Sequence, residues 1–453
     1  MKNILILGAG RSAASLIDYL LKHSVAENWQ VKIGDYQPSF AEKAVQGYAN
    51  ASAFTFNVFD ETQRANEVQQ ADVVISLLPA SFHIHVGKAC LQYKKPLFTA
   101  SYISKEFSDL ARDVEEAGLL FLMESGLDPG IDHMTAMQAI DEIRAQGGEL
   151  FSFKSYTGGL LAPQSEDNPW RYKFTWNPRN VVLAGQGTAQ FIRNGLYKYI
   201  PYHNLFTRVE DIVIPGYGDF EAYPNRDSLS YRKVYGLEDI PTMLRGTIRR
   251  PGYGAAWNLL VRLGLTDDSY TLENASTMTY RQFINAFLAY DTTRSVEEKV
   301  CRYFGIGETS EEFQKLAWLG LFEDEMIGLE NPTPAQVLQK KLEERWHFGE
   351  DDRDMIVMQH QFGYFVNNQP KRLTASLVSI GRDHVQTAMS DTVGWPLAMA
   401  VKNYLQGKYT QVGVVRPVTQ EIYQPILAEL LEKGIEFTET TEDWKEPLPQ
   451  PVS

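Results

Sequence analysis

The stretch GAGRSA directly follows the apolar run NILIL near the start of the chain. Gly8 permits a tight turn, and Gly10 lets the backbone approach a bound group closely. Ala13 lets the following helix pack against the strand, and the N-terminus of that helix presents unpaired N–H groups that favour phosphate. A strand, a turn of this kind and a helix together predict a site for the pyrophosphate of a dinucleotide.

Asp35 ends the next predicted strand, QVKIG, and bears on which dinucleotide binds. A carboxylate at this point accepts hydrogen bonds from the ribose hydroxyls of NAD and repels the 2′-phosphate of NADP. The alternative is that Asp35 only caps the following turn. Because Arg11 is able to reach a 2′-phosphate, the sequence favours NAD and leaves NADP open.

Further cofactor contacts are expected beyond the carboxyl ends of the other strands, because ligands of such sheets bind there. The third strand ends on the adenine side and the fourth on the nicotinamide side. The predicted cofactor-binding residues are Gly8, Gly10, Arg11, Ser12, Ala13, Asp35, Asn57, Val58, Ser76, Leu77 and Ser101.

Two polar stretches, TASYIS at 99–104 and MESGLDPGIDH at 123–133, follow the fifth and sixth predicted strands and are expected at the same crevice. Asp128 precedes Pro129, which favours extended backbone and lets the carboxylate project inward. We therefore predict a functional role for Asp128. Asp132 opens the next helix and is either a second functional acid or a helix cap.

Arginines gather in three loop-like stretches, NPWRYKF, YPNRDS and LRGTIRR. In an acidic chain they predict either a clamp for carboxylate or phosphate groups or an ordinary solvated surface. His83 and His85 do not predict a metal site, because their spacing converges only on a strand, this stretch starts a helix, and no third ligand is evident.

The elements that must position these residues follow from the hydrophobic pattern. Over the first part of the chain, short apolar runs alternate with amphipathic stretches of helical length, which predicts parallel βαβ units and an α/β, doubly wound Rossmann sheet of six strands. The middle of the chain reads as mixed α and β. Helical patterns occupy 310–346 and 393–407, and 354–366 reads as a strand.

Length, charge and cysteine content limit the function classes. A chain of 453 residues is too long for one hydrophobic core, so two or three domains are expected. A formal net charge of -14 argues against nucleic acid or an anionic membrane as the main partner. Two distant cysteines fit a reducing compartment, and we expect no signal peptide, no transmembrane helix and a cytoplasmic location.

Several motifs occur in the order found in one family: DVVISLLPASFH, TASYIS, ESGLDPGIDHMTAMQAID, YPNRDS, RGTIR, WLGLF and TVGWPLAMA. On these motifs the sequence resembles the saccharopine dehydrogenase family, glutamate-forming type (saccharopine reductase). The resemblance implies a Rossmann domain over 1–130, completed by about 390–453. It also implies an inserted α/β domain over 131–390, with a helical segment near 310–346, that binds substrate and forms a homodimer.

The implied reaction oxidises saccharopine with a nicotinamide cofactor to L-glutamate and 2-aminoadipate 6-semialdehyde in lysine metabolism, or runs in reverse. Carried over residue by residue, the family's site gives catalytic roles to Tyr102 and Asp128 and carboxylate pairing to Arg226 and Arg249. The implied substrate-binding residues are Ser101, Tyr102, Asp128, Thr157, Asn225, Arg226, Thr247, Ile248 and Arg249, with Asn168 and Lys173 as further positions and no metal ligand.

The sequence departs from the family pattern at two places. Thr157 stands where members usually have cysteine, so no proton transfer is expected there. Asp35 stands near the place where fungal members, which use NADP, carry arginine, and this again favours NAD.

Two alternatives remain open. A carboxynorspermidine dehydrogenase-like imine reductase of polyamine synthesis takes a diamine and aspartate semialdehyde, and needs acidic groups rather than the arginines of YPNRDS and RGTIR. A catalytically inert nucleotide-binding scaffold has no need of Tyr102, Asp128, Arg226 and Arg249.

Overall fold

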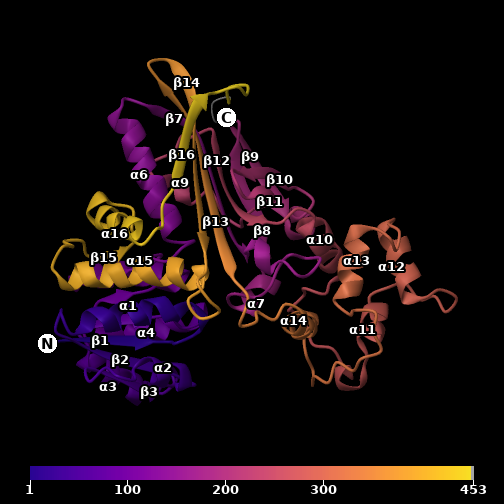
Figure 1. Cartoon of the computed structure of the whole chain (residues 1–453), viewed down its shortest axis with the longest axis horizontal. Coiled ribbons are helices and arrows are strands. Elements are labelled where there is room, and N and C mark those ends of the chain that lie inside the picture. The colour runs from indigo at the N-terminus through magenta and orange to yellow at the C-terminus, as the bar shows by residue number, and fades with distance from the viewer. Residues whose placement is uncertain (450–453) are drawn as a thin grey trace. The chain divides into compact units, whose positions relative to one another are not determined.

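The computed structural model describes residues 1–449, apart from the side chain of Arg11. The chain forms two compact units (Figure 1). The first comprises Met1–Glu149 and Leu377–Thr438, and the second comprises Leu150–Ser376 and the segment that begins at Glu439. The site residues predicted from the sequence are divided between the two units.

The first unit contains a parallel sheet of seven strands in the order β15-β6-β5-β4-β1-β2-β3. The strands are β1 (Lys2–Leu7), β2 (Trp29–Asp35), β3 (Ala51–Thr55), β4 (Val73–Ser76), β5 (Leu97–Phe98), β6 (Leu120–Leu122) and β15 (Gly413–Val415). The order from β3 to β6 is that of a doubly wound Rossmann sheet, so the predicted fold class is confirmed. The short strand β15, which pairs in parallel with β6, was not predicted.

Helices connect these strands and cover the sheet, as a parallel sheet requires. They are the 3-10 turns η1 (Arg11–Ala13) and η2 (Ala80–Phe82), and the α-helices α1 (Ala14–Ser24), α2 (Ser39–Ala44), α3 (Glu61–Gln70), α4 (His83–Gln92), α5 (Lys105–Glu116), α6 (Ile131–Ala145), α15 (Ala388–Leu405) and α16 (Gln420–Glu432). The helix predicted over 393–407 is α15, which begins several residues earlier.

The late helix α15 packs against α1, the helix that follows the glycine turn (Figure 1). Their close approach requires Gly394, because a Cβ there would lie 2.7 Å from the backbone nitrogen of Leu16. The Ser15 N–H donates to the Ser390 hydroxyl at 2.9 Å, and the Ser15 hydroxyl donates to Asp391 at 2.5 Å. The C-terminal part of the chain therefore fixes the first turn of α1.

The second unit contains a mixed sheet of nine strands, with the path β10-β11-β12-β7-β13-β14-β16 and with β8 paired to β12 and β9. The strands are β7 (Glu149–Leu161), β8 (Thr188–Arg193), β9 (Leu196–Pro201), β10 (Glu210–Ile214), β11 (Gly218–Pro224), β12 (Thr242–Arg249), β13 (Asp354–Val366), β14 (Gln369–Ile380) and β16 (Thr438–Asp443). The strand predicted at 354–366 is β13.

The remaining helices lie between these strands in the chain. They are η3 (Pro163–Ser165), η4 (Ala275–Thr277), α7 (Pro178–Val182), α8 (Tyr202–Leu205), α9 (Tyr231–Val234), α10 (Tyr253–Leu263), α11 (Tyr280–Ala286), α12 (Val296–Phe304), α13 (Glu311–Trp318) and α14 (Pro334–Arg345). The predicted helical stretch 310–346 is α13 and α14. Within residues 1–449, no helix combines the length and the apolar character needed to cross a membrane.

Replacing Gly8 by alanine is expected to destabilise the protein more than the same change at Gly47. Both have positive φ (+104° and +87°), but a Cβ at Gly8 would lie 2.8 Å from the carbonyl carbon and oxygen of Leu77, whereas Gly47 has nothing within 4 Å. We expect Gly47→Ala to lower the free energy of unfolding in urea by about 1 kcal/mol and Gly8→Ala by about 2–4 kcal/mol. Equal losses would show that the Leu77 contact does not limit the turn.

Candidate active site

The turn after β1 has the geometry of a dinucleotide-binding loop. Gly8 donates its N–H to the Gly34 carbonyl at 2.8 Å, which ties the turn to β2. A Cβ at Gly10 would meet nothing within 4 Å, so the turn is open on that side. Among the described side chains, none caps the N-terminus of η1. A close-packed glycine, an open glycine and an uncapped helix start fit a bound pyrophosphate.

Asp35 lies beside this turn, at the end of β2. Its Oδ2 accepts the Ala9 N–H at 2.6 Å, and its Oδ1 accepts the Gln37 N–H at 2.8 Å. The carboxylate therefore holds both the glycine turn and the turn after β2, which is the capping role. Asp35 performs this role at the position where an acid that binds the ribose is expected. The Arg11 side chain, the other predicted determinant of cofactor choice, lies outside the described part of the structure.

The remaining predicted cofactor residues lie in the turns after β1, β3 and β4. Asn57 and Val58 form the loop after β3, where the Asn57 side chain accepts the Phe59 N–H at 3.0 Å and Val58 is buried. Leu77 follows β4 and presents its backbone to Gly8, while Ser12 and Ala13 lie in η1, with Ala13 buried.

His83 brings together two of the predicted residues, Ser76 at the end of β4 and Ser101 after β5. Its Nδ1 lies 2.7 Å from the Ser76 hydroxyl, and its Nε2 lies 2.7 Å from the Ser101 hydroxyl. Burial lowers the pKa of His83 to about 4, so the imidazole is neutral at physiological pH. His83, which the sequence analysis did not assign to the site, thus bridges the end of β4 and the turn after β5.

Tyr102 and Asp128, the two residues expected to be catalytic, are joined in the first unit. The Tyr102 hydroxyl donates to Asp128 Oδ1 at 2.8 Å, and Tyr102 is 44% exposed. A carboxylate that is oriented by a phenol and borders on solvent is able to exchange a proton with a bound amine.

The loops that carry this pair are held by Glu124, a buried carboxylate that the sequence analysis did not single out. Its Oε1 accepts the Ile103 N–H at 3.0 Å and lies 3.0 Å from Arg416 Nε, while its Oε2 lies 2.9 Å from His133 Nε2. Burial alone would raise the pKa of Glu124, but the hydrogen bond to His133 and the charges of His133 and Arg416 lower it to about 2. Asp132 accepts the Gly130 N–H at 2.6 Å, a contact of the helix-cap kind.

In the second unit, Arg249 is a buried cation at the end of β12, with 3% exposure. Its Nη1 donates to the Ile248 carbonyl at 2.9 Å, and its Nε has no hydrogen-bond partner. The guanidinium carbon lies 5.2 Å, 5.4 Å and 5.9 Å from the ring centroids of Tyr253, Tyr172 and Tyr223. Within the described part of the chain this cation has no carboxylate partner.

The sheet register places Arg249 on the same face as other predicted substrate contacts. Thr247 pairs with Thr157 of β7 and with Tyr223 of β11, and the two-residue period of a strand puts Arg249 on that face. Thr157 Oγ1 and Tyr172 Oη are also buried without a partner. Unsatisfied buried polar atoms are rare in proteins, so this neighbourhood indicates a polar ligand, and Arg249 indicates that it is anionic.

The side chains of the other predicted substrate residues bond to groups of the chain itself. The Thr247 hydroxyl donates to Asn225 Oδ1 at 3.4 Å, and the exposed Arg226 donates to the Leu183 carbonyl at 3.2 Å. Lys173 pairs with Asp167 at 2.6 Å and Asp352 at 2.9 Å. Asn168 donates to the Tyr172 carbonyl at 3.1 Å. These last two side chains therefore hold the loop that bears Tyr172.

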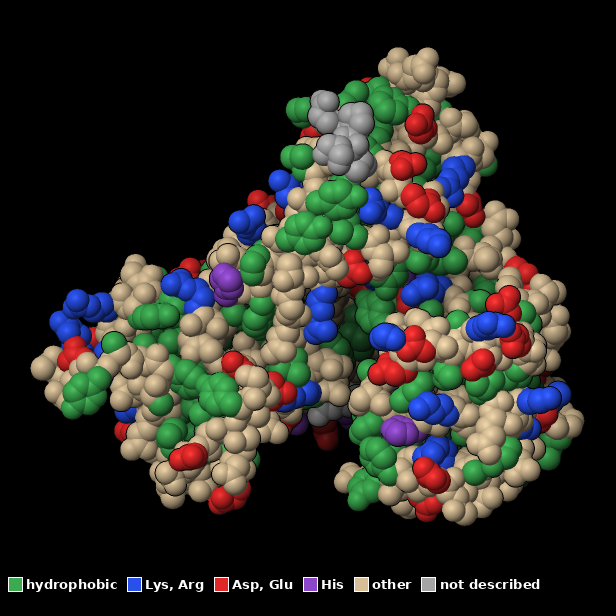
Figure 2. Space-filling view, turned by 180° about the vertical axis from the view of Figure 1, so that it is seen from behind, with side chains coloured by type: hydrophobic (Ala, Val, Ile, Leu, Met, Phe, Trp, Pro, Cys, Tyr) green, Lys and Arg blue, Asp and Glu red, His purple; other side chains and the backbone are tan. Residues whose placement is uncertain are grey.

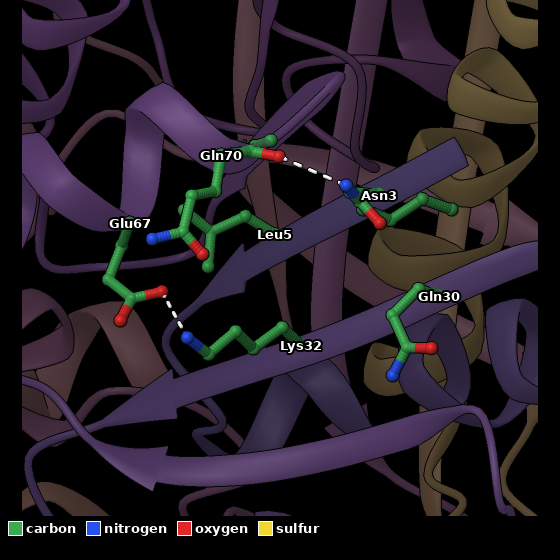
Figure 3. A pocket seen from close by; sticks show the side chains of 8 residues that line it. Asn3, Leu5, Gln30, Lys32, Glu67 and Gln70 are labelled. Carbon is green, nitrogen blue, oxygen red and sulfur yellow. Dashed lines mark hydrogen bonds and ion pairs between the residues drawn. The ribbon is translucent and has the colours of Figure 1, made fainter. Parts of the chain in front are cut away.

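On the face drawn in Figure 2, acidic and basic side chains are interspersed rather than gathered into one basic patch. A hollow of about 130 Å³ lies between α3 and the strands β1 and β2 (Figure 3). It is lined by Lys32, which pairs with Glu67 at 2.5 Å, and by Asn3, which donates to the Gln70 carbonyl at 3.1 Å. Because its strand residues precede the carboxyl ends of β1 and β2, it is not part of the nucleotide site.

The sheet order and the glycine turn define a dinucleotide-binding protein of the Rossmann class. The model of the saccharopine dehydrogenase NADP binding domain matches residues 4–122, and that of the saccharopine dehydrogenase C-terminal domain matches residues 126–435. The chain belongs to the saccharopine dehydrogenase family.

Curated relatives support this membership. Saccharopine dehydrogenase (NADP(+), L-glutamate-forming) of Saccharomyces cerevisiae is 33% identical over 450 residues, which cover 97% of this chain and 99% of that protein. The mitochondrial alpha-aminoadipic semialdehyde synthase of Rattus norvegicus is 34% identical over 448 residues, 96% of this chain and 47% of the relative. The chain thus spans about half the length of the synthases it matches.

Solved structures agree with the fold. Apo saccharopine dehydrogenase (L-Glu forming) from Saccharomyces cerevisiae superposes with a TM-score of 0.86 at 32% identity, over 98% of this chain and 100% of that chain. The homospermidine synthase of Legionella pneumophila, in complex with NAD, has a TM-score of 0.57 at 10% identity and shares only the fold. The family model and the curated names favour NADP, against the preference for NAD that Asp35 gave.

Replacing Glu124 by glutamine is expected to lower the free energy of unfolding by about 3 kcal/mol at neutral pH, because it removes a buried paired charge. The folded-state pKa, about 2, lies below the ordinary value of 4.5. The stabilisation is therefore fully present above about pH 4.5 and is lost as the pH falls toward about 2.

The measurement is urea unfolding of the wild type and Glu124→Gln at several pH values between about 7 and about 3.5. The difference in unfolding free energy should narrow as the pH falls below about 4.5. Glu432→Gln, on the exposed end of α16, is the control and should change stability by less than about 0.5 kcal/mol. A difference that stays constant over this pH range would contradict the paired state of Glu124.

Proposed function

We propose that the protein oxidises saccharopine with NADP to L-glutamate and 2-aminoadipate 6-semialdehyde, and catalyses the reverse condensation. The observation that carries this proposal is Arg249, a cation that is 3% exposed and has no carboxylate partner within the described chain. A buried charge is costly unless it is paired, so the site is built for an anionic ligand. Saccharopine has three carboxylates.

The glycine turn and the helix start at η1 hold the dinucleotide through backbone N–H groups, as their fit to a pyrophosphate indicates. A nicotinamide held there would supply the hydride acceptor for the carbon next to the substrate nitrogen. Ser76 and Ser101, at the ends of β4 and β5, lie where such sheets hold that half of the cofactor.

Asp128 is the base that the first unit provides. A secondary amine is largely protonated at neutral pH and must lose this proton before the neighbouring carbon is oxidised. The Asp128 carboxylate accepts that proton, while the hydrogen bond from Tyr102 fixes its orientation. After Asp128, which is partly exposed, has released this proton to solvent, its carboxylate takes a proton from the water that adds to the imine. Thr157, which lacks an acid or base group, supplies a hydroxyl contact only.

The polyamine alternative is not favoured. It requires acidic groups for a diamine, whereas Arg249 gives the second unit a buried cation that has no carboxylate partner among the described residues. The homospermidine synthase shares the fold at 10% identity, which says nothing of substrate. Homodimer formation and a cytoplasmic location remain predictions.

The direct test is to mix the purified protein with saccharopine and either NADP or NAD and to follow the absorbance of the reduced cofactor. We expect turnover with both, and a kcat/KM about 10-fold higher with NADP. A preference for NAD would restore the electrostatic argument from Asp35 and contradict the NADP assignment. Turnover of a diamine with aspartate semialdehyde, but not of saccharopine, would contradict the proposal.

Adjacent arginines separate a role in binding from a role in stability. Among the described residues Arg249 has no carboxylate partner, whereas Arg250 pairs with Glu166 at 2.6 Å. Arg249→Met should raise the KM for saccharopine about 10- to 100-fold, because a charge-assisted contact is lost, and should leave the Kd for NADPH unchanged.

The matched variant Arg250→Met should lower the free energy of unfolding more than Arg249→Met does, because it leaves the buried Glu166 with one partner fewer. Steady-state kinetics and urea unfolding of both variants provide the comparison. An unchanged KM in Arg249→Met would remove Arg249 from the substrate site.

A further inference from the structure

His83 is a buried side chain that no step above uses. It is the first residue of α4 and is 2% exposed. Its two ring nitrogens each lie 2.7 Å from a serine hydroxyl, Ser76 at the end of β4 and Ser101 after β5. Ser76 is fully buried, while Ser101 is partly exposed. The imidazole thus connects the buried hydroxyl of Ser76 to the partly exposed hydroxyl of Ser101, beyond the carboxyl ends of the parallel strands.

The protonation state of the ring limits what the two hydroxyls do. Because burial keeps His83 neutral, it offers one N–H donor and one bare nitrogen acceptor. One serine must therefore donate its proton to the ring, and the other must accept the ring N–H. The serine that accepts keeps its own O–H available for another partner. His83 therefore connects the end of β4 and the turn after β5. Its tautomer determines which of the two serines, Ser76 or Ser101, keeps an O–H that can donate to another partner.

We propose that His83 is a positioning residue that fixes the Ser101 hydroxyl for contact with the bound nicotinamide dinucleotide. Ser101 immediately precedes Tyr102, whose hydroxyl donates to Asp128 at 2.8 Å, so the same contact sets the start of the loop that carries Tyr102. The inference rests on the proposed function for its ligand, but the geometry is that of the chain alone. His85, two residues along α4, packs edge-on against Phe59 at 5.6 Å and belongs to no such bridge.

Two polar substitutions of His83 each keep one of its two serine contacts and remove the other. The amide of asparagine reaches about as far as Nδ1 and keeps the Ser76 contact, whereas the amide of glutamine reaches about as far as Nε2 and keeps the Ser101 contact. We expect His83→Asn to raise the Kd for NADPH, measured by nucleotide fluorescence, about 10-fold. His83→Gln should stay within about 3-fold of the wild type, and the control His85→Asn within about 2-fold.

A double-mutant cycle tests whether His83 acts through Ser101. Ser101→Ala should weaken NADPH binding about as much as His83→Asn does, and the double variant should be no weaker than Ser101→Ala. Equal effects of His83→Asn and His83→Gln, or additive effects in the cycle, would overturn the proposal. Thermal unfolding of each variant shows whether it is folded, and if the His83 variants do not fold, an unchanged Kd in Ser101→Ala overturns it.

This experiment stands apart from the proposed function, because NADPH binding requires no substrate. If the wild type binds NADPH but does not turn over saccharopine, the proposed function fails while the asparagine and glutamine variants still decide the role of His83. If saccharopine turns over, kcat/KM should fall in parallel with NADPH affinity in His83→Asn and remain near wild type in His83→Gln.

Discussion

The catalytic half of the first unit depends on one buried carboxylate, that of Glu124. Three segments converge on it: the loop after β5 through the Ile103 N–H, the start of α6 through His133, and the chain after β15 through Arg416. A carboxylate without these partners would not remain charged in such surroundings. The loops that carry Tyr102 and Asp128 are therefore held in place by this ion cluster.

The two units differ in how a buried charge is compensated. In the first, Glu124 is completely buried and paired, so its charge contributes to stability. In the second, Arg249 is also buried, yet its Nε has no hydrogen-bond partner, and three tyrosine rings lie near the guanidinium. Cation–π contacts compensate part of the desolvation cost, but less than a carboxylate does. A protein that keeps such an arrangement gives up stability at that point, which is typical of a binding site.

Local sequence patterns were sufficient to predict the fold, but they did not identify all the residues that position the site. Strands β1 and β4 are buried apolar runs that are followed by turn or helix signals, so the local sequence alone predicts them. β15 has three residues, and only its pairing with β6 makes it a strand. Glu124 lies in a stretch that the sequence analysis quoted, but its importance comes from Arg416, a residue far along the chain that carries no signal of its own. The bridging role of His83 has the same cause, because Ser76 and Ser101 come from different strands.

Asp35 shows why a single motif position is weak evidence for cofactor choice. Its carboxylate has a structural task in the chain itself, since both oxygens accept backbone N–H groups. The first turn of α1 is likewise fixed from outside the motif, by Ser390 and Asp391 of α15. Burial raises the pKa of Asp391, although the hydrogen bond from Ser15 and the charge of Arg382 oppose this effect. The nucleotide turn is thus supported by the docking of α15 on α1, a contact between segments far apart in the sequence. The glycine motif specifies a turn that is able to bind a dinucleotide, while the packing of the C-terminal segment determines the orientation in which that turn is presented.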